Sequence, residues 1–210
     1  MNHPASPNLL EHPLAQSAFN IAAVSPGCAV ARLCHALDAS FDGCAGAPDP
    51  SHRASFAKDV RAALAEAAAD PLLLTGGQRE GAATCYRRHL LAADPLGRYA
   101  IAALVWMPGQ ASPIHAHHTW CGYAMIDGTL TETVYDWNAA ADAATPVREQ
   151  SREPGAVSFT RAGRAGIHRL GNVSDTSAIS LHIYGVPGEQ ITTHVNDIVR
   201  VARSAPAVIG

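Results

Sequence analysis

Short apolar runs separated by turn dipeptides fill the second half of this 210-residue chain, and they constrain its fold more than any other feature. The runs begin at Tyr99, and the breaks between them include Pro108-Gly109, Asp127-Gly128, Pro154-Gly155 and Gly171-Asn172. This pattern predicts strands near 99–106, 113–117, 120–126, 130–136, 156–160, 166–170 and 177–185. Several short strands at such spacing favour an all-β sandwich or barrel.

The first part of the chain has helical patterning instead. One helix is expected from about Ala29 to Leu37, and a second from Ser51 to Asp70, where apolar residues recur at helical spacing and a proline follows. The expected architecture is therefore mainly β. Residues 1–75 form a helical segment that packs on a β-barrel domain spanning residues 76–210.

Composition and charge exclude several classes of function. Lys58 is the only lysine and is not followed by Ser or Thr, which excludes a Walker-type phosphate loop. The net charge is −3, and no basic stripe exists to follow a nucleic-acid backbone. No segment reaches the roughly 18 uninterrupted apolar residues of a membrane span, and the N-terminus has no signal-peptide pattern. We therefore expect neither a nucleic-acid partner nor a membrane partner.

The cysteines are five in number and form no CxxC pair. An odd number without such a pair is not typical of a disulfide framework or a zinc ribbon. The pattern predicts reduced thiols, and hence a cytoplasmic protein. The residues concerned are Cys28, Cys34, Cys44, Cys85 and Cys121.

Histidines stand out, with eleven in the chain and several close together. His115 and His117 lie in a predicted strand, where alternate side chains share a face, so the two imidazoles can bind one metal ion. His118 is expected to point the other way. Some fifty residues later comes Gly166-Ile167-His168, with Asn172 four positions beyond the histidine.

The spacing of these histidines and of the flanking Gly109 and Gly128 resembles that of the cupin superfamily. The first motif of that superfamily is G(x)5HxH(x)3–4E(x)6G, and its second motif ends in H(x)3N. This chain departs from the pattern, because Cys121 or Gly122 stands where the glutamate is expected. The second motif also lacks its proline, and it has a single residue between its glycine and its histidine.

This resemblance implies a cupin-type, jelly-roll-like barrel. It also implies a metal held by three neutral imidazoles, those of His115, His117 and His168, without a carboxylate. Such a set leaves the 2+ charge of the ion uncompensated, and an octahedral Fe(II) ion would keep open positions for substrate and oxygen. A thiolate suits this centre, because the metal stabilises the deprotonated thiol. A cupin that binds zinc or nickel, or no metal, remains the alternative.

A second group of polar residues narrows the class. Ser180, His182 and Tyr184 stand at i, i+2 and i+4, so on a strand they line one face and can form a hydrogen-bonded chain. A half-buried strand with ordinary polar groups would give the same spacing. The string Ser-x-His-x-Tyr-Gly, the three histidines, and the upstream Tyr86 and Arg88 together resemble the cysteine-dioxygenase-like thiol dioxygenases over about residues 80–190.

That resemblance implies one Fe(II) per chain and the oxidation of L-cysteine by O2 to cysteine sulfinate. Arg88 would bind the substrate carboxylate through paired hydrogen bonds, with Tyr86 at the pocket wall and Tyr184 as a hydrogen-bond donor. Members that prefer 3-mercaptopropionate have glutamine at the position of Arg88 and an arginine at that of Thr193, so both markers indicate the arginine-type branch. Arg161 or Arg164 could compete with Arg88 for the carboxylate.

Alternatives remain open at this stage. The thiol could instead be 3-mercaptopropionate or mercaptosuccinate, or the chain could be a metal-binding cupin that is not an oxygenase. The sequence does not give the oligomeric state.

One cysteine bears on a covalent modification of the family. Animal members of the family carry a cysteine cross-linked to the strand tyrosine, and counting from the histidine pair places that position at Gly122. We therefore expect Cys121, one residue short, to point away from the tyrosine and to pack without a cross-link.

Overall fold

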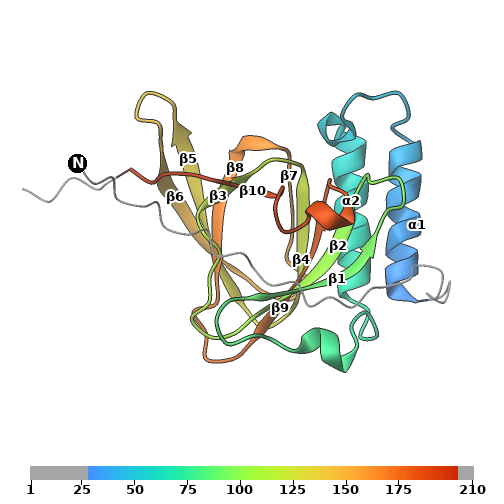
Figure 1. Cartoon of the computed structure of the whole chain (residues 1–210), viewed down its shortest axis with the longest axis horizontal. Coiled ribbons are helices and arrows are strands. Elements are labelled where there is room, and N and C mark those ends of the chain that lie inside the picture. The colour runs from blue at the N-terminus through green and yellow to red at the C-terminus, as the bar shows by residue number, and fades with distance from the viewer. Residues whose placement is uncertain (1–27, 203–210) are drawn as a thin grey trace, which may run out of the picture.

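The computed structural model describes residues 28–202; residues 1–27 and 203–210, with the expectations that fall on them, lie outside that part. Two antiparallel five-stranded sheets face each other, in the orders β1-β2-β9-β4-β7 and β10-β3-β8-β5-β6, and two helices lie along one side (Figure 1). The elements are α1 (Ala29–Asp42), η2 (Pro50–His52), α2 (Ala54–Ala68), η3 (Gly76–Arg79), β1 (Arg87–Ala93), β2 (Ala100–Trp106), β3 (His115–His117), β4 (Cys121–Asp127), β5 (Leu130–Asn138), β6 (Ala143–Arg152), β7 (Val157–Thr160), β8 (Gly163–Gly171), β9 (Ala178–Tyr184), η4 (Gly188–Gln190) and β10 (Asn196–Ile198).

The predicted fold class is confirmed, since the chain is mainly β with helices toward its N-terminus. All seven predicted strands occur, with ends that differ by a few residues. The sequence pattern misses β1, β6 and β10. Strand β1 is buried without alternation, β6 is a largely exposed and polar edge strand, and β10 has only three residues, so none of them shows the period-2 signal.

The first sheet separates the helices from the barrel interior. Its outer face packs on the helices, where Val60 and Leu64 of α2 share a core with Leu181 and Ile183 of β9. Gly122 of β4 also lies on this face, and a Cβ there would meet Leu64 Cδ1 at 2.8 Å. The opposite face carries the next residues along each strand into the barrel, because side chains alternate.

Both helices lie close to this one sheet and far from β5 and β6 in Figure 1. The limits of the two predicted parts, 1–75 and 76–210, stay a prediction. Within residues 28–202 no helix is long and apolar enough to cross a membrane.

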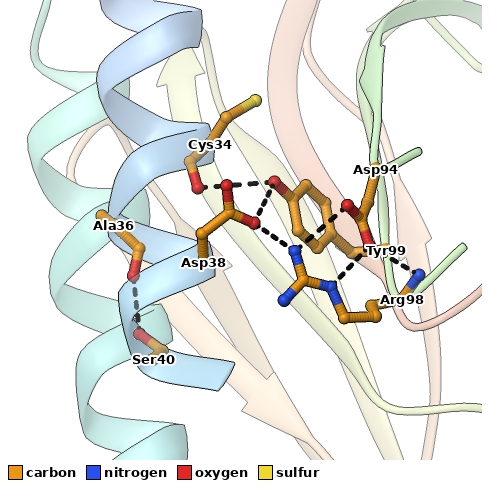
Figure 2. Close-up of polar contacts among 7 residues, drawn as sticks. All are labelled: Cys34, Ala36, Asp38, Ser40, Asp94, Arg98 and Tyr99. Atoms are coloured by element: carbon orange, nitrogen blue, oxygen red, sulfur yellow. Dashed lines mark hydrogen bonds and ion pairs between the residues drawn. The ribbon is translucent and has the colours of Figure 1, made fainter. Parts of the chain in front are cut away.

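A cluster of polar groups joins α1 to the turn between β1 and β2 (Figure 2). The Arg98 guanidinium donates to the buried Asp94 carboxylate at 2.6 Å and to Asp38 of α1. The Tyr99 hydroxyl donates to the same Asp38 carboxylate at 3.1 Å. Arg98 also lies over the Phe41 ring, with 4.9 Å between the guanidinium carbon and the ring centroid. One arginine therefore connects the helix, the turn and the aromatic core beneath them.

Arg98→Ala should lower the free energy of unfolding by about 1–3 kcal/mol, because it leaves the buried Asp94 carboxylate without its cation. Urea unfolding followed by circular dichroism measures this. Arg79→Ala is the matched control, since it removes an exposed ion pair with Asp127 at 3.7 Å and should change stability by less than about 0.5 kcal/mol. Equal effects of the two substitutions would contradict the role given to Arg98.

Candidate metal centre

Three histidines from two neighbouring strands converge inside the barrel. Strand β3 pairs with β8 so that His115 lies opposite His168, and His117 shares the inward face of β3. One ring nitrogen from each residue lies within 4.8 Å of the other two. His118 is exposed, as its strand position predicts. The structure thus brings together the three predicted ligands, although some fifty residues of chain separate the histidine pair from His168.

Hydrogen bonds orient two of these rings for metal binding. Nδ1 of His115 lies 2.9 Å from the Pro113 carbonyl oxygen, and Nδ1 of His168 lies 2.7 Å from Glu132 Oε1. Both acceptors favour the tautomer with hydrogen on Nδ1, which leaves Nε2 with a lone pair for a metal ion. Nδ1 of His117 is buried and makes no hydrogen bond within the described residues. Neutral imidazoles whose unprotonated ring nitrogens converge on one point suit a divalent transition metal.

Burial keeps His115 and His117 neutral. Desolvation, followed by the electrostatic interaction with His168, lowers the pKa of His115 to about 3. Desolvation also lowers the pKa of His117 well below its ordinary value. The lone pairs of both rings are therefore available at neutral pH, where a metal ligand must be unprotonated.

Glu132 is a functional candidate that the motif analysis misses. Its Oε1 accepts from His168 and its Oε2 accepts from Gln150 Nε2 at 2.7 Å, while Arg152 Nε lies 3.6 Å away. Burial alone would raise its pKa, but the contact with His168, the Gln150 hydrogen bond and the Arg152 charge lower it to about 2. The side chain is therefore an anion behind one metal ligand.

The sequence held a signal for this residue. Glu132 shares its strand face with Leu130, and both are buried. A carboxylate at a position that alternation buries is costly without a partner, so it marks a site.

Ser180, His182 and Tyr184 form a hydrogen-bonded chain on the inward face of β9. Trp106 Nε1 donates to Ser180 Oγ at 2.9 Å, Ser180 Oγ lies 2.8 Å from His182 Nε2, and His182 Nδ1 lies 3.1 Å from the Tyr184 hydroxyl. The Ser180 hydroxyl has no other acceptor within residues 28–202, so it donates to Nε2. Burial lowers the pKa of His182 well below its ordinary value, so the ring is neutral and its Nδ1–H donates to Tyr184. The Tyr184 O–H is then left to donate to a ligand.

Arg88 projects from β1 into the same cavity, which has a volume of about 20 Å³. Its guanidinium carbon lies 5.9 Å from the Tyr86 ring centroid and 5.8 Å from that of Tyr184. The residue is 4 % exposed, and no carboxylate pairs with it among the described residues. Nε of Arg88 is buried without a hydrogen-bond partner there. A buried cation without a carboxylate partner is costly, and an anion bound in the cavity would offset this cost.

The predicted direction of Cys121 is wrong. Cys121 lies directly opposite Tyr184 in the pairing of β4 with β9, and it faces the cavity, whereas Gly122 faces α2. The prediction placed the tyrosine-facing position at Gly122 by its spacing from the histidine pair. Residues 118–120 between them are not part of a strand, so this spacing does not fix which face Cys121 takes. Burial raises the pKa of the Cys121 thiol. The absence of a cross-link to Tyr184 stays a prediction, but side-chain direction no longer supports it.

Other residues considered from the sequence lie away from this cavity. Arg161 is exposed beside His52, and Arg164 pairs with Asp197 and stacks on Trp137, so neither lines the cavity that holds Arg88. Thr193 is exposed. Asn172 is buried in the turn before β9, where its side-chain amide donates to the backbone oxygens of Trp106 and Thr176. It therefore holds the turn in place and does not reach the three histidines.

Comparison with known proteins gives one family and several structural likenesses. The sequence profile described as cysteine dioxygenase type I matches residues 83–196, more than half of the chain. A crystal structure from Thermus thermophilus matches 55% of this chain and 97% of its own, at 19% identity and a TM-score of 0.42. For a conserved protein with a double-stranded β-helix domain from Klebsiella pneumoniae, the match covers 62% of this chain and 93% of that protein, at 12% identity and a TM-score of 0.44. For a cupin superfamily protein from Desulfitobacterium hafniense, it covers 51% of this chain and 83% of that protein, at 16% identity and a TM-score of 0.39.

Glu132→Gln should lower the affinity for a divalent metal by about 10- to 100-fold, because a neutral amide no longer strengthens His168 as a ligand. Competition between the protein and a chromophoric chelator for Ni(II) or Co(II) measures this without any turnover. Glu149→Gln is the matched control, since Glu149 is exposed on the neighbouring strand β6. An unchanged affinity in Glu132→Gln would show that the carboxylate does not act on the metal centre.

The metal-free protein should lose stability as the pH falls below about 6.5, the ordinary pKa of histidine. The unfolded chain binds protons there, whereas the folded chain excludes them until the depressed pKa is reached, which for His115 is about 3. The contribution of these buried histidines to stability is therefore fully present above about pH 6.5. Below that pH, each of them lowers the free energy of unfolding by up to about 1.4 kcal/mol per pH unit.

Urea unfolding of chelator-treated protein between about pH 7.5 and 4.5 measures this slope. His182→Gln should flatten the slope, while His118→Gln, at an exposed position, should leave it unchanged. A stability that does not vary over this range would contradict the burial of neutral imidazoles.

Proposed function

This chain belongs to the cysteine dioxygenase type I family, and on that premise we propose that it is a non-haem Fe(II) thiol dioxygenase that oxidises L-cysteine. The proposed products follow from adding both atoms of O2 to the sulfur, so the thiol becomes cysteine sulfinate without an external reductant. The partners are then a small thiol and dioxygen. We assign the chain to the arginine-type branch because Arg88 stands two residues after Tyr86.

The buried Arg88 guanidinium is the observation that carries the choice of substrate. It is buried, it has no carboxylate partner within residues 28–202, and it lines one cavity with His115, His117 and His168. A planar guanidinium binds a carboxylate through two parallel hydrogen bonds, which fixes the position of the ligand as well as its charge. A thiol acid held this way has its sulfur directed toward the three imidazoles.

His115, His117 and His168 would hold one Fe(II) ion, which would supply thiolate stabilisation and dioxygen activation when bound. The chain itself supplies position and hydrogen bonds. Tyr184, oriented by His182 and Ser180, donates its hydroxyl hydrogen to the substrate carboxylate or to an oxygen beside it. Tyr86 stacks on Trp106, with 4.3 Å between ring centroids, and closes the wall of the cavity beside Arg88. The small, walled cavity excludes bulk water from the reacting thiol.

A cytoplasmic location stays a prediction. All five cysteines are free in the structure, which fits the reducing compartment that the sequence favours.

Oxygen uptake by the Fe(II)-loaded protein, with L-cysteine and 3-mercaptopropionate in parallel, tests the proposal. We expect uptake with cysteine, matched mole for mole by sulfinate. Faster uptake with 3-mercaptopropionate at equal concentration would contradict the choice of substrate while leaving a thiol dioxygenase. No uptake with any thiol, in protein that holds iron, would favour a cupin that is not an oxygenase.

Arg88→Gln should raise the KM for cysteine at least tenfold, because a neutral amide cannot replace two charge-assisted hydrogen bonds to the carboxylate. Steady-state oxygen uptake over a range of cysteine concentrations measures this. Arg87→Gln is the matched control, because the Arg87 guanidinium lies 3.9 Å from Glu80 and does not line the cavity. A KM that is unchanged in Arg88→Gln would place the carboxylate elsewhere.

A further inference from the structure

A second cavity lies behind the three histidines. It has a volume of about 440 Å³ and shares His117, Cys121 and His168 with the cavity that contains Arg88. Its remaining polar lining comes mainly from β4, β5 and β6. The substrate position proposed for the thiol lies in the cavity that contains Arg88 and not in this one. We call it the rear chamber; its polar lining outside the shared residues includes Tyr123, Glu132, Arg148, Gln150, Arg152, Ser158 and Thr160.

Arg152 gives the rear chamber unused hydrogen-bond donors. Both oxygens of Glu132 already accept hydrogen bonds, one from His168 and one from Gln150, and Arg152 Nε stays 3.6 Å from this carboxylate. Nε and Nη2 of Arg152 are buried, and neither makes a hydrogen bond within the part of the chain that the structure describes. An ion pair with Glu132 therefore offsets the charge of the guanidinium but leaves its donors open.

Other groups in the rear chamber favour the same kind of ligand. The Tyr123 hydroxyl is buried without a hydrogen-bond partner among the described residues, and the guanidinium carbon of Arg152 lies 5.2 Å from the Tyr123 ring centroid. Arg148 adds a second positive charge at the exposed part of the lining. With Glu132 as the single carboxylate of the lining, the two arginines leave a net positive charge before any metal binds.

We infer that the rear chamber is a binding site for a small oxyanion, a carboxylate or a sulfinate, with Arg152 as its principal donor. A guanidinium fork matches either group geometrically. The oxyanion has two possible sources: a second acid group on the thiol substrate, or a free anion that binds beside the metal centre. The first source rests on the proposed function, and the second does not.

Binding of succinate to the metal-free protein, followed by isothermal titration calorimetry, tests the site without any turnover. We expect one succinate per chain, with a Kd that rises at least tenfold in Arg152→Gln and changes less than twofold in Arg88→Gln. Arg169→Gln is the matched control, because Arg169 neighbours His168 on β8 but is exposed. Arg152→Lys keeps the charge without the fork and should give an intermediate Kd.

A comparison with Glu132→Gln and one further variant separate ligand binding from a purely structural role of Arg152. If Arg152 only held Glu132 in place, Arg152→Gln would weaken metal binding as Glu132→Gln does and leave the affinity for succinate unchanged, which would overturn the inference. Tyr123→Phe keeps the ring and removes one donor, so it should weaken succinate binding even if Arg152→Gln fails to fold.

Oxygen uptake with mercaptosuccinate and 3-mercaptopropionate then identifies the source. A tenfold higher KM for mercaptosuccinate alone in Arg152→Gln would assign the rear chamber to the second carboxylate of a substrate. If the KM for mercaptosuccinate is the same in Arg152→Gln and in the wild-type protein, while Arg152→Gln weakens succinate binding as expected, the rear chamber would be assigned to a free oxyanion. The inference would be overturned if the wild-type protein bound no succinate. It would also be overturned if Arg88→Gln lost succinate binding and Arg152→Gln kept it. Both outcomes can be read in a protein that oxidises no thiol.

Discussion

Antiparallel pairing of β3 with β8 is the interaction on which the metal centre depends. It sets His115 opposite His168 and fixes the distance at which their rings meet. Backbone hydrogen bonds of a ladder hold this register independently of the histidines, so the ligands converge without a metal to gather them. Each ring then has a second nitrogen inside the barrel, and the Pro113 carbonyl and the Glu132 carboxylate accept from those of His115 and His168.

Charge is balanced in layers around the cluster. The sequence motifs predict three neutral imidazoles, which would leave a 2+ ion without a protein anion. The structure adds Glu132 one hydrogen bond behind His168, so a carboxylate is present but is not placed as a ligand. Arg88 in front has an unpartnered Nε, and Arg152 behind has an unpartnered Nε and Nη2, within the described residues. This arrangement favours anionic ligands at the centre while keeping the ligand set itself uncharged.

The two faces of the first sheet differ in role: the outer face packs on the helices, and the inner face carries polar residues of the candidate site. Helix α2 covers the outer face, close enough that a Cβ at Gly122 would meet Leu64 Cδ1 at 2.8 Å, and the polar chain of β9 lies on the inner face. Alternation along a strand keeps these two functions apart over its full length. Cys121 belongs to the inner face because the pairing of β4 with β9 decides its direction, and Tyr184 is its neighbour.

Relations within a single strand can be predicted from the amino-acid sequence. Period-2 patterning and turn dipeptides located seven strands, paired His115 with His117, and aligned Ser180 with His182 and Tyr184. Which faces meet depends on the folded chain. It brought His168 to His115, Glu132 behind His168 and Arg152 into the rear chamber, and it turned Cys121 inward. The physical reason is that alternation is a local property, whereas sheet register and the path of loops depend on pairing between segments that are distant along the chain.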